Sequence, residues 1–264
     1  MNSSHRSLTL LSAVAVLFLA GSLFARTPAD KPLERTDPNS QLAHQQLLDK
    51  AHHGHIDVYF LGDSITRRWG GTDYPKFLEN WKENFFGWNA ANFGWGGDTT
   101  QNILWRLENG ELDGVNPKVI VLLAGTNNVG RTPVPERTDG VPKGIKAILD
   151  LCQAKAPNAT IILMAIFPRN DGPDDSANRA IDKINEKIAT FADGKRIRFL
   201  NINDRLADPS GKLHEGIAVD KLHLTEKGYQ IWADALKPIL TELLGAPAKT
   251  DLAPPPTGDP KSAK

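Results

Sequence analysis

The sequence predicts an α/β protein, a three-layer α/β/α sandwich built on a parallel sheet of five strands. Five short apolar runs lack the polar alternation of a half-exposed strand, which is typical of strands buried on both faces. Segments with helical periodicity separate these runs, and such alternation gives parallel strands joined by right-handed crossovers. The 264 residues, 40% of them hydrophobic, are enough for one sizeable core.

The predicted strands end in glycine or polar residues. They are Val58–Leu61, Ala90–Phe93, Lys118–Ala124, Thr160–Ala165 and Ile197–Ile202. The first is followed by Asp63 and Ser64, the second by a glycine-rich loop over residues 94–100, and the third by Asn127 and Asn128. Ligands bind at the carboxyl edge of open α/β sheets, because loops and helix N-termini converge there. We therefore expect the functional site at this edge.

Six segments have the periodicity or the end signals of helices. They are Gln41–Ala51, Tyr74–Phe86, Thr99–Glu108, Gly140–Ala154, Ala177–Phe191 and Glu226–Leu244. In the second, Phe77, Trp81 and Phe85 recur at about one turn, which indicates an amphipathic helix. We expect Ser40 to cap the first helix, and Asp98 with Gln101 to form a capping pair for the third.

The two ends of the chain differ in composition from the segment 56–245, which we predict to be the catalytic domain. Arg6 precedes an apolar run, Leu8–Phe24, and this layout predicts a secretory signal over residues 1–25 and a secreted or periplasmic location. The run is also long enough to stay as a single membrane anchor. Residues 26–55 form a lead-in with a short helix, and the proline-rich tail 246–264 is expected to be disordered.

Charge and cysteine content exclude several classes of function. The 31 basic and 31 acidic residues balance, so no net field favours nucleic acid. The single cysteine, Cys152, excludes an intrachain disulfide and lies among apolar residues, as a core residue would. His52, His53 and His55 are too close in sequence to converge on one ion without a further ligand. We predict no metal and no cofactor.

Ser64 and the pair Asp220 and His223 have the chemistry of a serine hydrolase. Taken alone, Ser64 is either the N-cap of the next helix or a nucleophile at the sheet edge. Asp220 precedes His223 by three residues, so its carboxylate can accept the Nδ1 proton of the imidazole and orient it as a base. These three residues predict a catalytic triad.

The other two loops can supply hydrogen-bond donors to a developing oxyanion. The candidates are the backbone N–H groups of Ser64 and Gly97 and the side-chain amide of Asn127. Gly97 has no Cβ, which lets a substrate approach the backbone. An Asx turn is the alternative for Asn127 and Asn128. No Gly-x-Ser-x-Gly elbow and no P-loop is present, and Thr99 stands where a dinucleotide motif needs glycine.

Four blocks in this order resemble those of the SGNH (GDSL-like) hydrolases. They are FLGDSIT, NFGWGGDTT, GTNN and DKLHLT, and the resemblance spans residues 56 to about 244. The stretch NFGWGGDTTQNILWRL, followed by NGEL, is most similar to the catalytic subunits of intracellular platelet-activating factor acetylhydrolase.

This resemblance implies roles for matching residues and a metal-free reaction. It implies that Ser64 is the nucleophile, that Gly97 and Asn127 are oxyanion donors, and that Asp220 and His223 complete the triad on a flavodoxin-like sheet. The implied activity is that of an esterase that removes short acyl groups, commonly acetyl.

The signal and the resemblance together favour acetyl esters of carbohydrates or other small esters as substrates. A lysophospholipase or thioesterase, and a non-catalytic glycan-binding module, are the alternatives. Besides such an ester we expect no nucleic-acid partner, and no stable membrane partner unless the leader is retained. We name Asp63, Trp95, Asn128 and Lys221 as substrate contacts; Trp95 could stack on a sugar face or simply pack over a helix.

Overall fold

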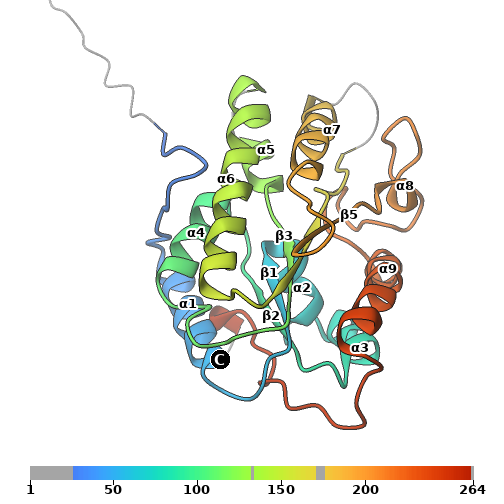
Figure 1. The fold of residues 1–264 in the computed structure, drawn as a ribbon. Coiled ribbons are helices and arrows are strands. Elements are labelled where there is room, and N and C mark those ends of the chain that lie inside the picture. Colours follow the sequence, from blue (N-terminus) through green and yellow to red (C-terminus); the bar gives the residue numbers. More distant parts are fainter. Residues whose placement is uncertain (1–25, 132–133, 171–175, 263–264) are drawn as a thin grey trace, which may run out of the picture.

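The computed structural model describes residues 26–131, 134–170 and 176–262, and its centre is a parallel five-stranded sheet (Figure 1). The strands are β1 Val58–Gly62, β2 Ala90–Gly94, β3 Val119–Leu123, β4 Thr160–Met164 and β5 Ile197–Leu200. Their order is β2-β1-β3-β4-β5, and every pair is parallel. The predicted fold class is confirmed. The predicted signal segment, residues 1–25, lies outside the described residues.

Helices cover both faces of the sheet (Figure 1). One face carries α1 Pro38–Ala51, α4 Thr100–Glu108, α6 Val134–Lys155 and α7 Ser176–Ala189, with the short α5 Thr126–Arg131 beside α6 and α7. The other carries α2 Ser64–Gly70, α3 Pro75–Phe85, α8 Asn203–Leu206 and α9 Glu226–Leu244. Among the described residues, no helix combines the length and apolar character needed to cross a membrane.

The sheet separates two hydrophobic cores. Along β1, Tyr59 and Leu61 pack into the core beneath α4 and α6, while Val58 and Phe60 pack into the core beneath α2, α3 and α9. Trp69 is fully buried in the second core and makes a ring contact with Phe60. Burial on both faces explains why the strands are apolar at successive positions.

Two helix caps differ from prediction. α1 begins at Pro38, and Asp37 rather than Ser40 caps it by accepting the Ser40 N–H at 3.0 Å. At the start of α4, the Thr99 N–H donates to Asn102 Oδ1 at 3.0 Å. Asp98 does not cap α4, because its buried carboxylate forms an ion pair with the buried Arg106.

The C-terminal tail, predicted to be disordered, is ordered up to Ser262, so that prediction is wrong for the part described. The tail leaves α9, passes edge strand β2 and ends beside α1 (Figure 1). The His55 N–H donates to Leu252 O at 2.8 Å, and the Thr72 N–H to Thr257 O at 3.1 Å. The proline content of the tail could not reveal this order. Prolines have no N–H to donate, and the N–H donors of these two hydrogen bonds belong to other segments of the chain.

Lys50 joins α1, β2 and the tail. The residue is 5% exposed, and Nζ donates to Asn92 O at 2.9 Å and to Thr257 Oγ1 at 2.8 Å. Burial lowers the pKa of Lys50 to about 7, from an ordinary value of 10.5. The charged form is therefore costly in the folded protein.

This depressed pKa predicts a pH-dependent stability. Between pH 7 and pH 10.5 the unfolded chain holds a proton on Lys50 that the folded chain has lost, so the wild type gains stability as pH rises through this window. The free energy of unfolding, measured with urea, should therefore increase for the wild type between pH 6 and pH 9. Relative to the wild type, Lys50→Met should lose on the order of a few kcal/mol over the same pH interval. Lys195→Met, at an exposed lysine, is the control, and a pH-independent difference for Lys50→Met would contradict the assignment.

Candidate active site

Ser64 is the first residue of α2, and only Asp63 separates it from the end of β1. Asp63 caps this helix, because its Oδ1 accepts the Ile65 N–H at 2.9 Å. The alternative in which Ser64 is the cap is therefore wrong. The Ser64 hydroxyl instead lies 2.9 Å from Nε2 of His223, 159 residues later in the chain.

His223 is oriented by Asp220. The imidazole Nδ1 lies 2.7 Å from Asp220 Oδ2. The other oxygen, Oδ1, accepts the backbone N–H of His223 at 2.8 Å and that of Leu222 at 3.2 Å. The carboxylate is thus held by the loop itself, and a proton on Nδ1 leaves Nε2 to accept from Ser64.

The charges around this pair favour a neutral imidazole beside an ionised carboxylate. Burial lowers the pKa of His223 below its usual 6.5. The positive charges of Arg68 and Arg169 also lower this pKa, and together these effects outweigh Asp220, which raises it. Burial opposes ionisation of Asp220, but the hydrogen bonds from His223 and the charge of Arg68, with Nη1 3.8 Å away, outweigh it and lower its pKa. This is the protonation state of a general base at neutral pH.

The structure brings the predicted oxyanion donors onto neighbouring loops. β1 pairs with both β2 and β3, so the loops that follow these strands meet beside Ser64. Gly97 has φ +80°, which suits glycine. Asn127, in α5 rather than in an Asx turn, donates from Nδ2 to Asp98 O at 2.9 Å. An amide nitrogen carries a second hydrogen that can serve a ligand.

Sequence reasoning missed a buried ionic network under these loops. The Arg106 side chain is 4% exposed, and its Nε donates to Asp98 Oδ2 at 2.7 Å. Nη1 donates to Phe93 O at 3.1 Å and also to Glu111, and Nη2 donates to Gly62 O at 3.4 Å. One guanidinium thus ties the ends of β1 and β2 to the glycine-rich loop. The available signal was a charged residue on the apolar face of a helix, between Ile103 and Leu107.

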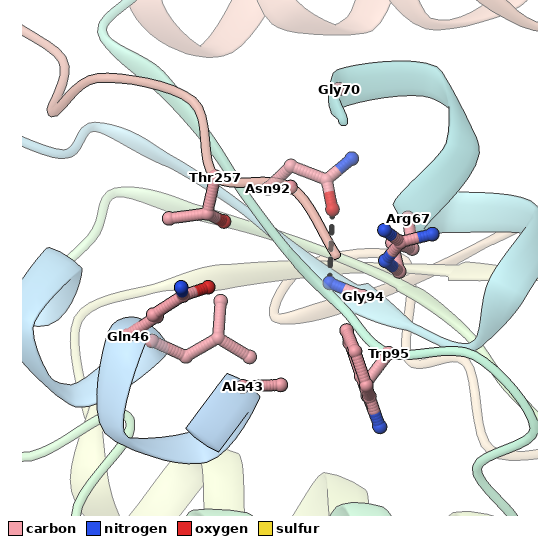
Figure 2. A pocket seen from close by; sticks show the side chains of 10 residues that line it. Ala43, Gln46, Arg67, Gly70, Asn92, Gly94, Trp95 and Thr257 are labelled. Atoms are coloured by element: carbon pink, nitrogen blue, oxygen red, sulfur yellow. Dashed lines mark hydrogen bonds between the residues drawn. The ribbon is translucent and has the colours of Figure 1, made fainter. Parts of the chain in front are cut away.

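Trp95 is not a sugar-stacking residue. It is 6% exposed, and its Nε1 donates to Ser40 Oγ at 2.9 Å. Figure 2 shows its indole in a small cavity bordered by α1, α2 and the tail, with Arg67 beside it. This cavity of about 10 Å³ has room for about one water molecule. The predicted alternative, packing against a helix, describes Trp95.

Asp63 and Asn128 are also buried away from any substrate, which corrects their prediction as contacts. Asp63 is fully buried, and burial raises its pKa to about 7. Asn128 is 3% exposed and accepts the Thr100 N–H on Oδ1 at 2.9 Å, which joins the glycine-rich loop to α5. Lys221 adopts φ 63° in the turn between the two triad partners, and its carbonyl accepts the Asn170 N–H at 2.7 Å. A substrate contact by its side chain stays a prediction.

The histidine cluster and the cysteine have no catalytic surroundings. His55 Nε2 lies 3.2 Å from Asp57 Oδ1. Within the described part of the chain, no group of three or more His, Cys, Asp or Glu side chains could hold a metal ion. Cys152 is buried in the first core, and burial raises the pKa of its thiol to about 12, so it is inert as a nucleophile.

Comparison with known proteins finds a matching family model and a similar relative. The model of the GDSL-like Lipase/Acylhydrolase family matches residues 60–231. Platelet-activating factor acetylhydrolase IB subunit alpha1 of Bos taurus is 34% identical over 224 residues, which cover 82% of this chain and 90% of the relative.

Two solved structures share the fold. A GDSL-like lipase from Bacteroides thetaiotaomicron matches with a TM-score of 0.58 at 23% identity. The match covers 71% of this chain and 88% of the lipase chain. An acetylxylan esterase from Geobacillus stearothermophilus matches with a TM-score of 0.54 at 19% identity. The match covers 73% of this chain and 96% of the esterase chain. At these identities the likeness shows the fold alone.

The lowered pKa of His223 predicts the pH dependence of the reaction. Protonated His223 cannot accept the Ser64 proton, so kcat/KM on p-nitrophenyl acetate should rise with pH through a midpoint below 6.5. Arg68→Ala removes a positive charge that depresses this pKa, so the midpoint should move upward. Arg196→Ala, at an exposed arginine before β5, should leave the profile unchanged. A flat profile from pH 5 to 8, or an unmoved midpoint in Arg68→Ala, would count against His223 as the base.

Proposed function

The chain belongs to the GDSL-like lipase/acylhydrolase family and is a carboxylic ester hydrolase, and from this premise we propose that it removes short acyl groups, acetyl above all, from carbohydrates or other small alcohols. The observation that carries the proposal is the hydrogen-bonded series Ser64, His223 and Asp220 at the carboxyl edge of the sheet. The names of the relatives support the acyl group: a 34% identical protein is an acetylhydrolase, and one that shares the fold is an acetylxylan esterase.

In the first half of the proposed reaction Ser64 takes the acyl group. Its Oγ attacks the ester carbonyl carbon while His223 Nε2 accepts the hydroxyl proton, and Asp220 stabilises the resulting imidazolium. The carbonyl oxygen becomes negative and receives hydrogen bonds from Gly97, Asn127 and the Ser64 N–H. When the carbon–oxygen bond to the alcohol breaks, His223 returns the proton to the leaving oxygen.

In the second half water releases the acid. The neutral imidazole of His223 takes a proton from a water molecule, whose oxygen attacks the acyl carbon of the ester on Ser64. A second tetrahedral intermediate uses the same donors. Its collapse breaks the bond to Ser64 Oγ, which regains the proton from His223. The products are one carboxylic acid and one alcohol, and the enzyme is restored.

A series of p-nitrophenyl esters from acetate to decanoate, together with acetylated xylan and acetylated monosaccharides, tests this proposal. We expect the highest kcat/KM with acetate. Ser64→Ala should lose at least about 10³-fold in kcat, since it removes the nucleophile. Asn127→Ala should lose about 10²- to 10³-fold, as loss of one oxyanion donor does elsewhere.

Two outcomes would contradict this proposal. Equal rates for the wild type and Ser64→Ala would remove the catalytic assignment. A rate that rises with acyl length would replace the short-acyl assignment by a lysophospholipase or thioesterase activity.

We also propose that the protein is exported by its first 25 residues. Arg6 ahead of the apolar run Leu8–Phe24, and the small residue Ala25 at its end, support a cleaved signal. Expression of the full chain in a bacterial host should give periplasmic protein with Arg26 as its first residue, determined by N-terminal sequencing. Leu17→Arg interrupts the apolar run and should abolish processing. Full-length protein in the membrane fraction, or in the cytosol, would contradict cleavage.

A further inference from the structure

Arg35 contacts the glycine-rich loop from outside the family match. It lies in the lead-in before α1, and its Nη1 donates to Gly96 O at 3.1 Å and to Asp98 Oδ1 at 3.3 Å. Its Nε and Nη2 both lie 3.1 Å from Oδ2 of Asp37, the residue that caps α1. The guanidinium therefore bridges the start of α1 and the loop that carries Gly97.

The carbonyl that Arg35 holds belongs to the same peptide unit as the Gly97 N–H. The described part of the chain contains no cis peptide bond, and in a trans unit the N–H points away from the C=O. Fixing the Gly96 oxygen toward Arg35 thus fixes the Gly97 N–H in the opposite direction. That N–H is one of the three donors proposed for the oxyanion.

The two residues of this peptide unit have no side chains that could hold it by packing. Both flanking residues are glycines, and a Cβ built on Gly96 would meet no atom within 4 Å. Gly97 has φ +80°, and glycine populates either sign of φ at similar energy. Rotation of the peptide unit is therefore opposed mainly by hydrogen bonds, of which the one from Arg35 carries a full charge.

The charge of Arg35 also strengthens the donor. A hydrogen bond from a cation to a carbonyl oxygen draws electron density from the peptide nitrogen, and such polarisation makes the N–H a better donor to a further acceptor. The effect is largest when a negative oxygen forms on the other side, so it favours the transition state over the bound ester.

We propose that Arg35 is a positioning residue for the oxyanion hole, which holds and polarises the Gly96–Gly97 peptide. This inference rests on the proposed function. Arg35 acts on the outer side of the loop and its side chain is 31% exposed, whereas Arg106 anchors Asp98 from the buried side. The outer contact can therefore be removed while the inner anchor stays in place.

The test compares Arg35→Ala, Arg35→Lys and the wild type on p-nitrophenyl acetate. Arg35→Ala should lose about 10- to 100-fold in kcat, less than the loss of a donor itself, with KM changed by no more than about twofold. Arg35→Lys should recover part of the loss, because an ammonium can still donate to Gly96 O. The pH midpoint and the thermal midpoint should stay near those of the wild type.

Arg196→Ala is the matched control. Its guanidinium also donates to a backbone carbonyl, Pro157 O at 2.6 Å, but it precedes β5 at the opposite edge of the sheet. We expect its kcat to equal that of the wild type.

Three results would overturn the inference. These are a wild-type kcat in Arg35→Ala, a loss in KM alone, and a loss in kcat that is fully explained by a shifted pH midpoint. If Arg35→Ala unfolds, Arg35→Gln against Arg35→Lys at a permissive temperature gives the same comparison. Equal rates for the wild type and Ser64→Ala would instead reject the proposed function, so the two failures are distinguishable.

Discussion

The buried guanidinium of Arg106 is the interaction on which the arrangement of the site depends. It binds the last residue of β1, the carbonyl of Phe93 near the end of β2, and the carboxylate of Asp98 in the following loop. Glu111 supplies a second carboxylate. Removing one member of such a buried group leaves an uncompensated charge, which costs about 3–5 kcal/mol. The network therefore favours one arrangement of these loops over partly formed ones.

From Asp98 the constraint extends to the groups proposed for catalysis. The Asp98 carbonyl accepts a hydrogen bond from the Asn127 side-chain amide, and the second carboxylate oxygen of Asp98 accepts one from Arg35. The loops after β2 and β3 therefore share one anchor. Two of the proposed oxyanion donors are held by such bonds: Arg35 holds the Gly96–Gly97 peptide unit, and the Asp98 carbonyl holds the Asn127 amide. His223 is fixed in the same way, because Asp220 is itself held by two backbone N–H groups of its loop. Such fixed donors need little reorganisation when charge develops.

The sequence was informative where chemistry and periodicity are local. The β1 segment is recognisable as a buried strand because Val58 to Leu61 are apolar on both faces. The three-residue spacing of Asp220 and His223 predicts that the carboxylate can reach the imidazole Nδ1. Ser64 and His223 could be paired because few other residues have complementary chemistry at a sheet edge. That pairing joins positions 159 residues apart, and the structure places them 2.9 Å apart.

Residues whose roles depend on distant partners were missed or misread. The position of Arg106 on the apolar face of its helix signals burial but not its partners, because the carboxylates and carbonyls that it binds come from four separate segments. Arg35 binds a loop 61 residues away, with no local signal. Trp95 looked accessible because glycines surround it, yet α1 and the tail cover it. The order of the tail likewise depends on partners such as His55 and Thr72, which its own composition cannot show.

Whether Ser64 is the nucleophile is tested most directly by identifying the residue that a fluorophosphonate modifies. The wild-type protein is treated with a fluorophosphonate, digested, and analysed by peptide mass spectrometry, beside His223→Ala. We expect a single adduct on Ser64, formed much more slowly in His223→Ala. An adduct on another residue, or none on active wild-type protein, would contradict this assignment.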